Sequence, residues 1–141
     1  MLLKHLMQIK NKSINYKMKT IFITGATSGI GKATAETFAK QGHRLIICGR
    51  RKEVLEQLQI ELSNITEVYS LVFDVRNQQE VENAIHSLPE EWKNIDVLVN
   101  NAGNAHGLES ISEGNIADWD AMMDGNVKGL LYVSQPIIKI M

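Results

Sequence analysis

A glycine-rich segment near the amino terminus is the first candidate for chemistry. Residues 24–31 read T-G-A-T-S-G-I-G, after a short apolar run and before a helical pattern. Glycines at such a junction let the chain turn sharply and let a pyrophosphate approach the backbone closely. A helix that begins there offers unpaired N–H groups and a partial positive charge to phosphates. The segment therefore predicts a dinucleotide site formed by Gly25, Ala26, Thr27, Ser28, Gly29, Ile30 and Gly31.

The spacing of the glycines separates this loop from other phosphate-binding loops. A Walker A loop would need glycine at position 26 and serine or threonine at position 33, where this chain has Ala26 and Ala33. The common G-x-G-x-x-G fingerprint fails at Thr27, and a T-G-x-x-G-x-x-G variant fails at Ser28. The pattern that remains is T-G-x-x-x-G-x-G. Its alternative interpretation is a glycine-rich turn that binds no ligand.

Two arginines stand where a dinucleotide site usually reads the adenosine ribose. Arg50 follows Gly31 by nineteen residues, Arg51 comes next, and the first acid after them is Glu53. An acid at this place would accept the 2′-hydroxyl of NAD, whereas guanidinium groups suit a 2′-phosphate. Arginines at the start of a helix also oppose its dipole, which a bound anion would offset. The sequence predicts NADP rather than NAD, and the alternative is a pair of solvated arginines.

Two further segments follow apolar runs that are typical of β-strands. Asp74-Val75 follows the third run, and N-N-A-G at residues 100–103 follows the fourth. Ligands of open parallel sheets bind at the carboxyl ends of the strands. An aspartate also suits a strand-to-helix turn, and side-chain amides can satisfy backbone groups of neighbouring loops. The candidate residues from these segments are Asp74, Val75, Asn101, Ala102 and Gly103.

The elements that must position these residues alternate between strand and helix. Short apolar runs predict buried strands at 21–24, 45–48, 68–72 and 97–99, and a helical pattern follows each of them. An order βαβαβαβα with helices of this length requires right-handed crossovers and a parallel sheet. We therefore expect an α/β fold, a Rossmann-type doubly wound parallel sheet truncated after about four strands.

The spacing of apolar and capping residues predicts how the helices begin, end and pack. Gly42 has the position of a C-terminal cap for the first helix. Asn77, with Glu80 three residues later, is close to a capping box, and Asn115 could cap a long last helix. A period of 3.6 residues predicts that the first helix packs through Ile30, Ala33, Thr34, Thr37 and Phe38.

Taken in this order, the motifs resemble those of the short-chain dehydrogenase/reductase family. The resemblance covers residues 18–141 and includes D-G-N-V-K-G at 124–129. It implies an NADP-dependent oxidoreductase in which Asp74 contacts the adenine ring. It also implies that Asn126 belongs to a catalytic tetrad and helps to hold a water of the proton relay. The alternative for Asn126 is a packing role, because Asn and the neighbouring glycines weaken a helix interior.

Finer features point to one branch of that family. L-P-E-E-W at 88–92, N-I-D at 94–96 and D-W at 118–119 are similar to enzymes that oxidise serine, allo-threonine and 3-hydroxy acids with NADP and reduce malonic semialdehyde. The resemblance implies a small-molecule substrate and a cytoplasmic homodimer or homotetramer. His106 follows N-N-A-G and could line the substrate site, although such a histidine is more often solvated.

The other tetrad members, a serine after a fifth strand and a Y-x-x-x-K pair, have no counterpart in this sequence. None of Tyr16, Tyr69 and Tyr132 has a lysine four residues later. The resemblance therefore corresponds to the first half of a typical family member, and the alternatives are an inert NADP-binding module and a gene remnant. Truncation after the fourth strand would leave residues 97–99 as a bare apolar edge, so we expect poor stability of these residues alone.

Composition bounds the remaining possibilities. Of 141 residues, 44% are hydrophobic and 22% charged, as in a soluble globular domain, and a net charge of −1 favours neither nucleic acid nor an anionic membrane as partner. No apolar run approaches the ~18 residues of a membrane span. No metal is expected, and the lone Cys48 should be buried. We expect residues 18–141 to form the NADP-binding domain and residues 1–17 to be a disordered or mis-assigned extension.

Overall fold

Four strands of the protein form one parallel sheet. The computed structural model describes residues 17–141, so nearly all of the extension predicted at 1–17 lies outside the described residues. The strands are β1 (Thr20–Ile23), β2 (Arg44–Gly49), β3 (Val68–Val72) and β4 (Val97–Val99), in the spatial order β3-β2-β1-β4. This arrangement confirms the Rossmann-type α/β fold. Each strand lies within one residue of its predicted bounds.

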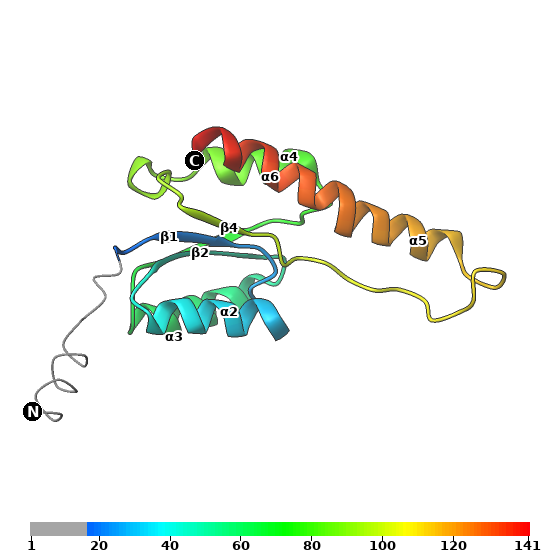
Figure 1. Ribbon diagram of the computed structural model, residues 1–141, viewed down its shortest axis with the longest axis horizontal. Helices are drawn as coiled ribbons and strands as arrows, with labels where there is room; N and C mark the ends of the chain where they lie inside the picture. The colour runs from blue at the N-terminus through cyan, green and yellow to red at the C-terminus, as the bar shows by residue number, and fades with distance from the viewer. Residues whose placement is uncertain (1–16) are drawn as a thin grey trace, which may run out of the picture.

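Helices cover both faces of this sheet (Figure 1). Helices α2 (Gly29–Lys40) and α3 (Lys52–Ser63) lie on one face, and α4 (Gln78–His86) and α6 (Gly129–Ile140) lie on the other. Strand β1 is central: Ile23 is in register with Ile47 of β2 and with Val99 of β4. Within residues 17–141, β4 pairs only with β1 and forms an edge whose three residues are half-buried. The sheet therefore separates two helical layers and two apolar clusters.

Alternate residues of the central strands supply the two clusters. Ile21 and Ile23 point toward α2 and α3, whereas Phe22 between them points toward α4 and α6. Successive side chains of a strand face opposite sides, so a strand buried on both faces becomes a continuous apolar run. Cys48 belongs to the second cluster and is buried as expected, and its burial raises the pKa of the thiol well above the ordinary value.

Helix α2 packs through a different face from the one that the sequence predicted. Its buried residues are Gly31, Ala35 and Ala39, while Ile30 is 80% exposed. Of the five residues predicted for this face, Phe38 is the one that packs against the core. The prediction was wrong because it weighted large apolar side chains. The buried face instead carries small residues, and at Gly31 even a Cβ would lie 2.2 Å from the carbonyl oxygen of Gly25.

Helix α4 begins as its capping residues predict. The Asn77 side chain accepts a hydrogen bond from the backbone N–H of Glu80 at 3.2 Å, and it donates to the Glu80 carboxylate at 2.9 Å. The same carboxylate accepts from the backbone N–H of Asp74 at 3.0 Å. This reciprocal arrangement pairs N–H groups that the helix start would leave free. It also joins the end of β3 firmly to the helix that follows.

The last helix is long, as expected, but it is not uniform. Asn115 caps α5 (Ile116–Met122) by accepting from the backbone N–H of Ala117 at 2.9 Å. A π-helical segment η2 (Met123–Lys128) follows, and α6 continues from Gly129. The π segment was not predicted from the sequence. Such segments widen a helix by one residue per turn and occur often at functional sites.

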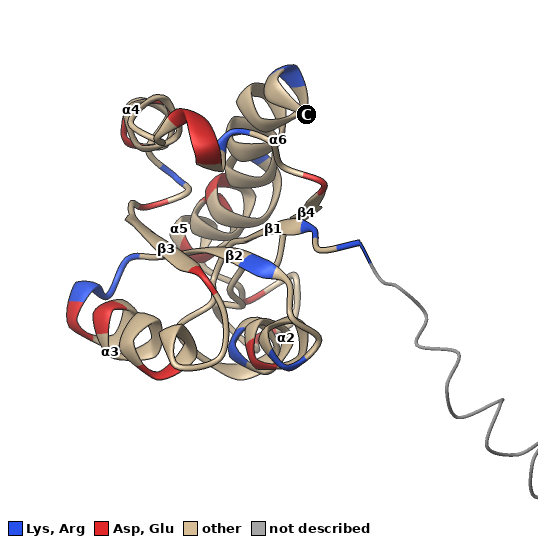
Figure 2. Ribbon diagram, turned by 90° about the vertical axis from the view of Figure 1, so that its left-hand side faces the viewer, with Lys and Arg blue, Asp and Glu red and all other residues tan. Residues whose placement is uncertain are grey.

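Charges of both signs are mixed over the helices (Figure 2). On α2 and α3 the acidic and basic residues form exposed ion pairs, for example Lys32 with Glu36 at 3.9 Å and Lys52 with Glu56 at 3.8 Å. Pairs of this kind contribute little to stability but keep the local charge balanced. None of the helices described in residues 17–141 combines the length and the apolar character needed to cross a membrane.

The end of α2 yields a stability prediction. Gly42 has φ of +78° and forms a Schellman motif, in which its N–H donates to Ala39 O and His43 N–H donates to Phe38 O. We expect Gly42→Ala to lower the free energy of unfolding in urea by about 1 kcal/mol, because a Cβ disfavours this backbone region. Gly42→Asn should recover part of the loss, because asparagine tolerates positive φ. Equal stability of all three proteins would contradict this account.

Candidate cofactor-binding site

A cleft of about 570 Å³ lies at the carboxyl ends of the strands. It spans the junction between β1 and β4, where the strand order reverses and where ligands bind in sheets of this kind. Of the residues proposed from the sequence, those that line it are Gly25, Thr27, Ser28, Ile30, Arg50, Arg51, Asp74, Val75, Asn101, Ala102 and Gly103. Ala26, Gly29, Gly31 and Asn126 are not among its lining residues.

The glycine loop approaches its neighbours more closely than any side chain would permit. A Cβ on Gly31 would lie 2.2 Å from the carbonyl oxygen of Gly25 and 2.3 Å from the side-chain nitrogen of Asn101. Gly25 and Gly29 also have positive φ, of 65° and 56°. Ala26 is fully buried beneath the loop. Glycines 25 and 31 therefore bring the start of α2 against the end of β1, and the first turn of α2 opens toward the cleft.

A set of hydrogen bonds joins the ends of β1 and β4. The hydroxyl oxygen of Thr24 accepts from the backbone N–H groups of Asn101 and Ala102, both at 3.0 Å. The Asn101 side chain donates to the carbonyl oxygens of Thr24 and Gly25, both at 3.1 Å. The sequence predicted that these amides satisfy neighbouring backbone groups, and the structure confirms it for Asn101. The role of Thr24 was not predicted, since a threonine at a strand end carries no specific signal.

Arg51 contacts the glycine loop directly. Its guanidinium donates to the hydroxyl oxygens of Thr27 at 2.9 Å and Ser28 at 3.0 Å. Ser28 is the N-cap residue of α2, but its side chain does not cap the helix, so the first-turn N–H groups keep no side-chain partner. Gly49 lets the glycine loop approach the end of β2, because a Cβ there would lie 2.7 Å from Thr27 Cγ2. The result is a guanidinium, two hydroxyls and a helix N-terminus on one side of the cleft.

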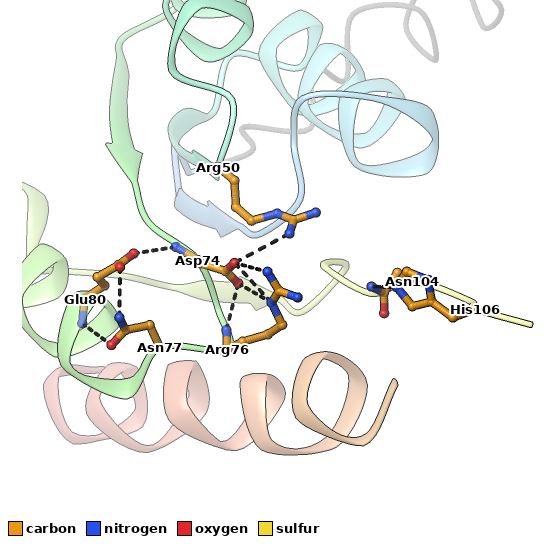
Figure 3. Close-up of polar contacts among 7 residues, drawn as sticks. All are labelled: Arg50, Asp74, Arg76, Asn77, Glu80, Asn104 and His106. Carbon is orange, nitrogen blue, oxygen red and sulfur yellow. Dashed lines mark hydrogen bonds and ion pairs between the residues drawn. The ribbon is translucent and has the colours of Figure 1, made fainter. Parts of the chain in front are cut away.

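The carboxylate of Asp74 lies between two guanidinium groups (Figure 3). Arg76 contacts it through Nε at 3.1 Å and Nη2 at 2.6 Å, and Arg50 approaches to 3.5 Å. Partial burial acts to raise the pKa of Asp74, but the hydrogen bonds and charge of Arg76, together with the charge of Arg50, outweigh it and lower the pKa. Arg76 was missed by the sequence interpretation, although its place two residues after an aspartate is typical of a side-chain-stabilised turn.

Asn126 lies beside the cleft and holds a residue that lines it. Its side chain accepts from the backbone N–H of Asn104 at 2.8 Å and donates to the Asn104 carbonyl oxygen at 2.7 Å. Gly103 gives room for this contact, because a Cβ there would lie 3.0 Å from Asn126 Oδ1. The π segment η2 carries Asn126 toward the loop after β4. Asn104 was also missed, because it follows the N-N-A-G motif without belonging to it.

Comparison with known proteins agrees with this geometry. The family model described as short chain dehydrogenase matches residues 19–141, and the chain belongs to this family. It is 44% identical over 118 residues to the NADP-dependent 3-hydroxy acid dehydrogenase YdfG of Escherichia coli and 43% identical over 118 residues to sulfoacetaldehyde reductase 2 of Chromohalobacter salexigens. Each match covers 84% of this chain and 47% of the relative. The chain thus spans about half the length of the curated relatives it matches.

A solved structure gives the same result for the fold. The closed form of serine dehydrogenase complexed with NADP⁺ matches with a TM-score of 0.79 and 43% sequence identity. The match covers 86% of this chain and 48% of the solved chain. These comparisons confirm the family and the branch to which the sequence motifs pointed.

The close approach at Gly31 yields the first prediction for the site. We expect Gly31→Ala to weaken NADPH binding by more than tenfold and to destabilise the fold by roughly 1–3 kcal/mol, because the added methyl overlaps backbone that cannot move freely. NADPH fluorescence titration and urea unfolding measure the two effects. Ala33→Ser, on the exposed side of the same helix, is the matched control; it should leave NADPH binding unchanged and cost at most about 0.5 kcal/mol of stability. Wild-type behaviour of Gly31→Ala would contradict the assigned packing.

The lowered pKa of Asp74 yields a prediction about acid stability. A depressed carboxyl pKa contributes stability that is present at neutral pH and is lost as the pH falls through the folded-state pKa. We therefore expect the unfolding free energy of wild type to exceed that of Asp74→Asn at pH 7, with the difference shrinking between about pH 5 and about pH 3. Urea unfolding at several pH values measures this. A similar pH-dependent difference for the control Asp120→Asn, at an exposed residue, would count against the Asp74 contacts as its source.

Proposed function

We propose that the protein carrying this chain is an oxidoreductase that transfers hydride between NADP(H) and a small 3-hydroxy acid or related alcohol or carbonyl compound. The observation that carries the proposal is the anion site formed by Arg51, the hydroxyls of Thr27 and Ser28, and the N-terminus of α2. It is supported by relatives whose names include NADP-dependent 3-hydroxy acid dehydrogenase and sulfoacetaldehyde reductase. Bound NADP(H) would supply or accept the hydride.

The residues of the site fit the parts of such a cofactor. The glycine loop offers backbone N–H groups to the pyrophosphate. Because the space at Gly31 excludes any side chain, no bulky group there blocks the approach of the pyrophosphate to the loop. Arg51 suits the 2′-phosphate, because a guanidinium forms charge-assisted hydrogen bonds with phosphate oxygens. An ionised Asp74 can accept a hydrogen bond from the adenine amino group, and Val75, which lines the cleft, packs against Gly129.

For the reacting end of the cofactor we assign Asn126 the positioning role that the family resemblance implies. Its two hydrogen bonds to the backbone of Asn104 fix the loop after β4 relative to η2. The sequence contains no Y-x-x-x-K, the pair to which the family resemblance assigns proton exchange with the substrate. We further propose a cytoplasmic homodimer or homotetramer as the working form of the protein.

An inert NADP-binding module is the second candidate function. Such a module would use the same cleft and would bind cofactor without turnover. Reading the DNA beyond codon 141, and expressing the longest product, separates the two. A serine and a Y-x-x-x-K in that product, with NADP-dependent oxidation of 3-hydroxybutyrate, would support the oxidoreductase.

The anion site yields a prediction about cofactor choice. In the longest product, Arg51→Ala should raise the dissociation constant of NADPH by about tenfold or more and leave that of NADH nearly unchanged, because only NADPH carries the 2′-phosphate. Lys52→Ala is the matched control, since Lys52 is the next residue and pairs with Glu56 instead. Fluorescence titration measures both constants. Equal losses for NADPH and NADH would remove the basis for assigning Arg51 to the 2′-phosphate.

A further inference from the structure

The polar groups in and beside the cleft fall into two sets (Figure 3). Asn104 lines the cleft, whereas His106, which contacts the Asn104 side chain, is not among the lining residues. Arg50, Arg51 and Arg76 follow β2 and β3, whereas Asn104 and His106 follow β4 on the other side. If the arginines hold the adenosine end of NADP, the reacting end points toward the loop that carries Asn104 and His106. A substrate with a carboxylate or sulfonate would then need a hydrogen-bond donor in this loop, away from the arginines.

The structure fixes the orientation of one such donor. The side-chain nitrogen of Asn104 lies 2.7 Å from Nε2 of His106. With the amide nitrogen as the donor, Nε2 is the acceptor, and the proton of the neutral ring is then on Nδ1. His106 is exposed, and its Nδ1–H is therefore available to a ligand. Asn126 forms hydrogen bonds with both the backbone N–H and the carbonyl oxygen of Asn104. Asn104, and the His106 ring that it orients, are therefore held next to Asn126, the residue assigned to the reacting end.

Asn104 itself is placed in a way that packing does not explain. Its side-chain oxygen is buried and has no hydrogen-bond partner among residues 17–141. It lies against Gly125, where a Cβ would come within 3.2 Å of it. An apolar side chain would fill this place without leaving an unpaired acceptor, so a buried amide here calls for another reason. The orientation of His106 supplies that reason.

Resting on the function proposed above, we infer that His106, oriented by Asn104, binds the anionic group of the substrate. The carboxylates of Glu109 and Asp118 both lie against Gly107, and their negative charge repels an anion. An anionic group can therefore bind beside this loop only through a specific hydrogen-bond donor. Lys128 is engaged with Asp124 at 2.7 Å, whereas only one of the two ring nitrogens of His106 is used in its contact with Asn104. Asn104 is a positioning residue, and His106 is a substrate-binding and specificity-determining residue.

The test compares an acid with its uncharged ester in the longest product of the reading frame. A hydrogen bond to a carboxylate is roughly twice as strong as one to a neutral acceptor. We expect His106→Leu to raise the KM for 3-hydroxybutyrate about tenfold, and that for methyl 3-hydroxybutyrate less than threefold, with NADPH affinity unchanged. Asn104→Leu should change the acid-to-ester ratio in the same direction by a smaller factor. His86→Leu, at an exposed histidine of α4, is the matched control and should leave the ratio unchanged.

A second measurement needs no turnover. Malonate binding to the NADPH complex, followed by cofactor fluorescence, should weaken about tenfold in His106→Leu and remain unchanged in His86→Leu. Unaltered malonate affinity in His106→Leu, or equal KM changes for acid and ester, would overturn the inference while leaving the proposed function intact. Failure of wild type to bind NADPH would instead overturn the proposed function, and the inference with it.

Discussion

The close contact between the ends of β1 and β4 is the constraint on which the rest of the site depends. Three backbone segments meet there, and the space between Gly25, Gly31 and the Asn101 amide is too small for a single methyl group. The hydroxyl of Thr24 and the amide of Asn101 pair the backbone groups that this approach would otherwise leave unsatisfied. Because an unpaired buried group costs about as much as a lost hydrogen bond, the packing and the pairing must occur together.

This junction also sets the electrostatics of the cleft. Since the Ser28 side chain is turned toward Arg51 rather than capping α2, the positive end of the helix dipole and a guanidinium act on the same space. Arg50 and Arg76, by contrast, are largely engaged by Asp74, whose carboxylate offsets part of their charge. The cleft is therefore not uniformly basic. One point, near Arg51, is suited to an additional phosphate.

The sequence predicted the strands, the capping residues and the residues around the cleft, because each depends on local chemistry that a short motif records. Runs of Val, Ile and Leu that are buried on both faces mark a strand whatever surrounds it. The buried face of α2 was mispredicted because it depends on the distance to the sheet, which no periodicity encodes. Thr24 and Asn104 escaped prediction for a similar reason. Their roles arise from partners far apart in the chain, as between Thr24 and Asn101.

The two ends of the cleft also differ in how firmly the fold specifies them. At the cofactor end, glycines and main-chain hydrogen bonds determine the shape, so substitutions there disturb the sheet itself. At the end near Asn104, a single side chain, Asn126, holds the loop through two hydrogen bonds, and the side chains that the loop presents are free to differ. A fold built in this way can keep one cofactor while its substrate changes. The residues that select the substrate should then be sought on this loop rather than in the glycine motif.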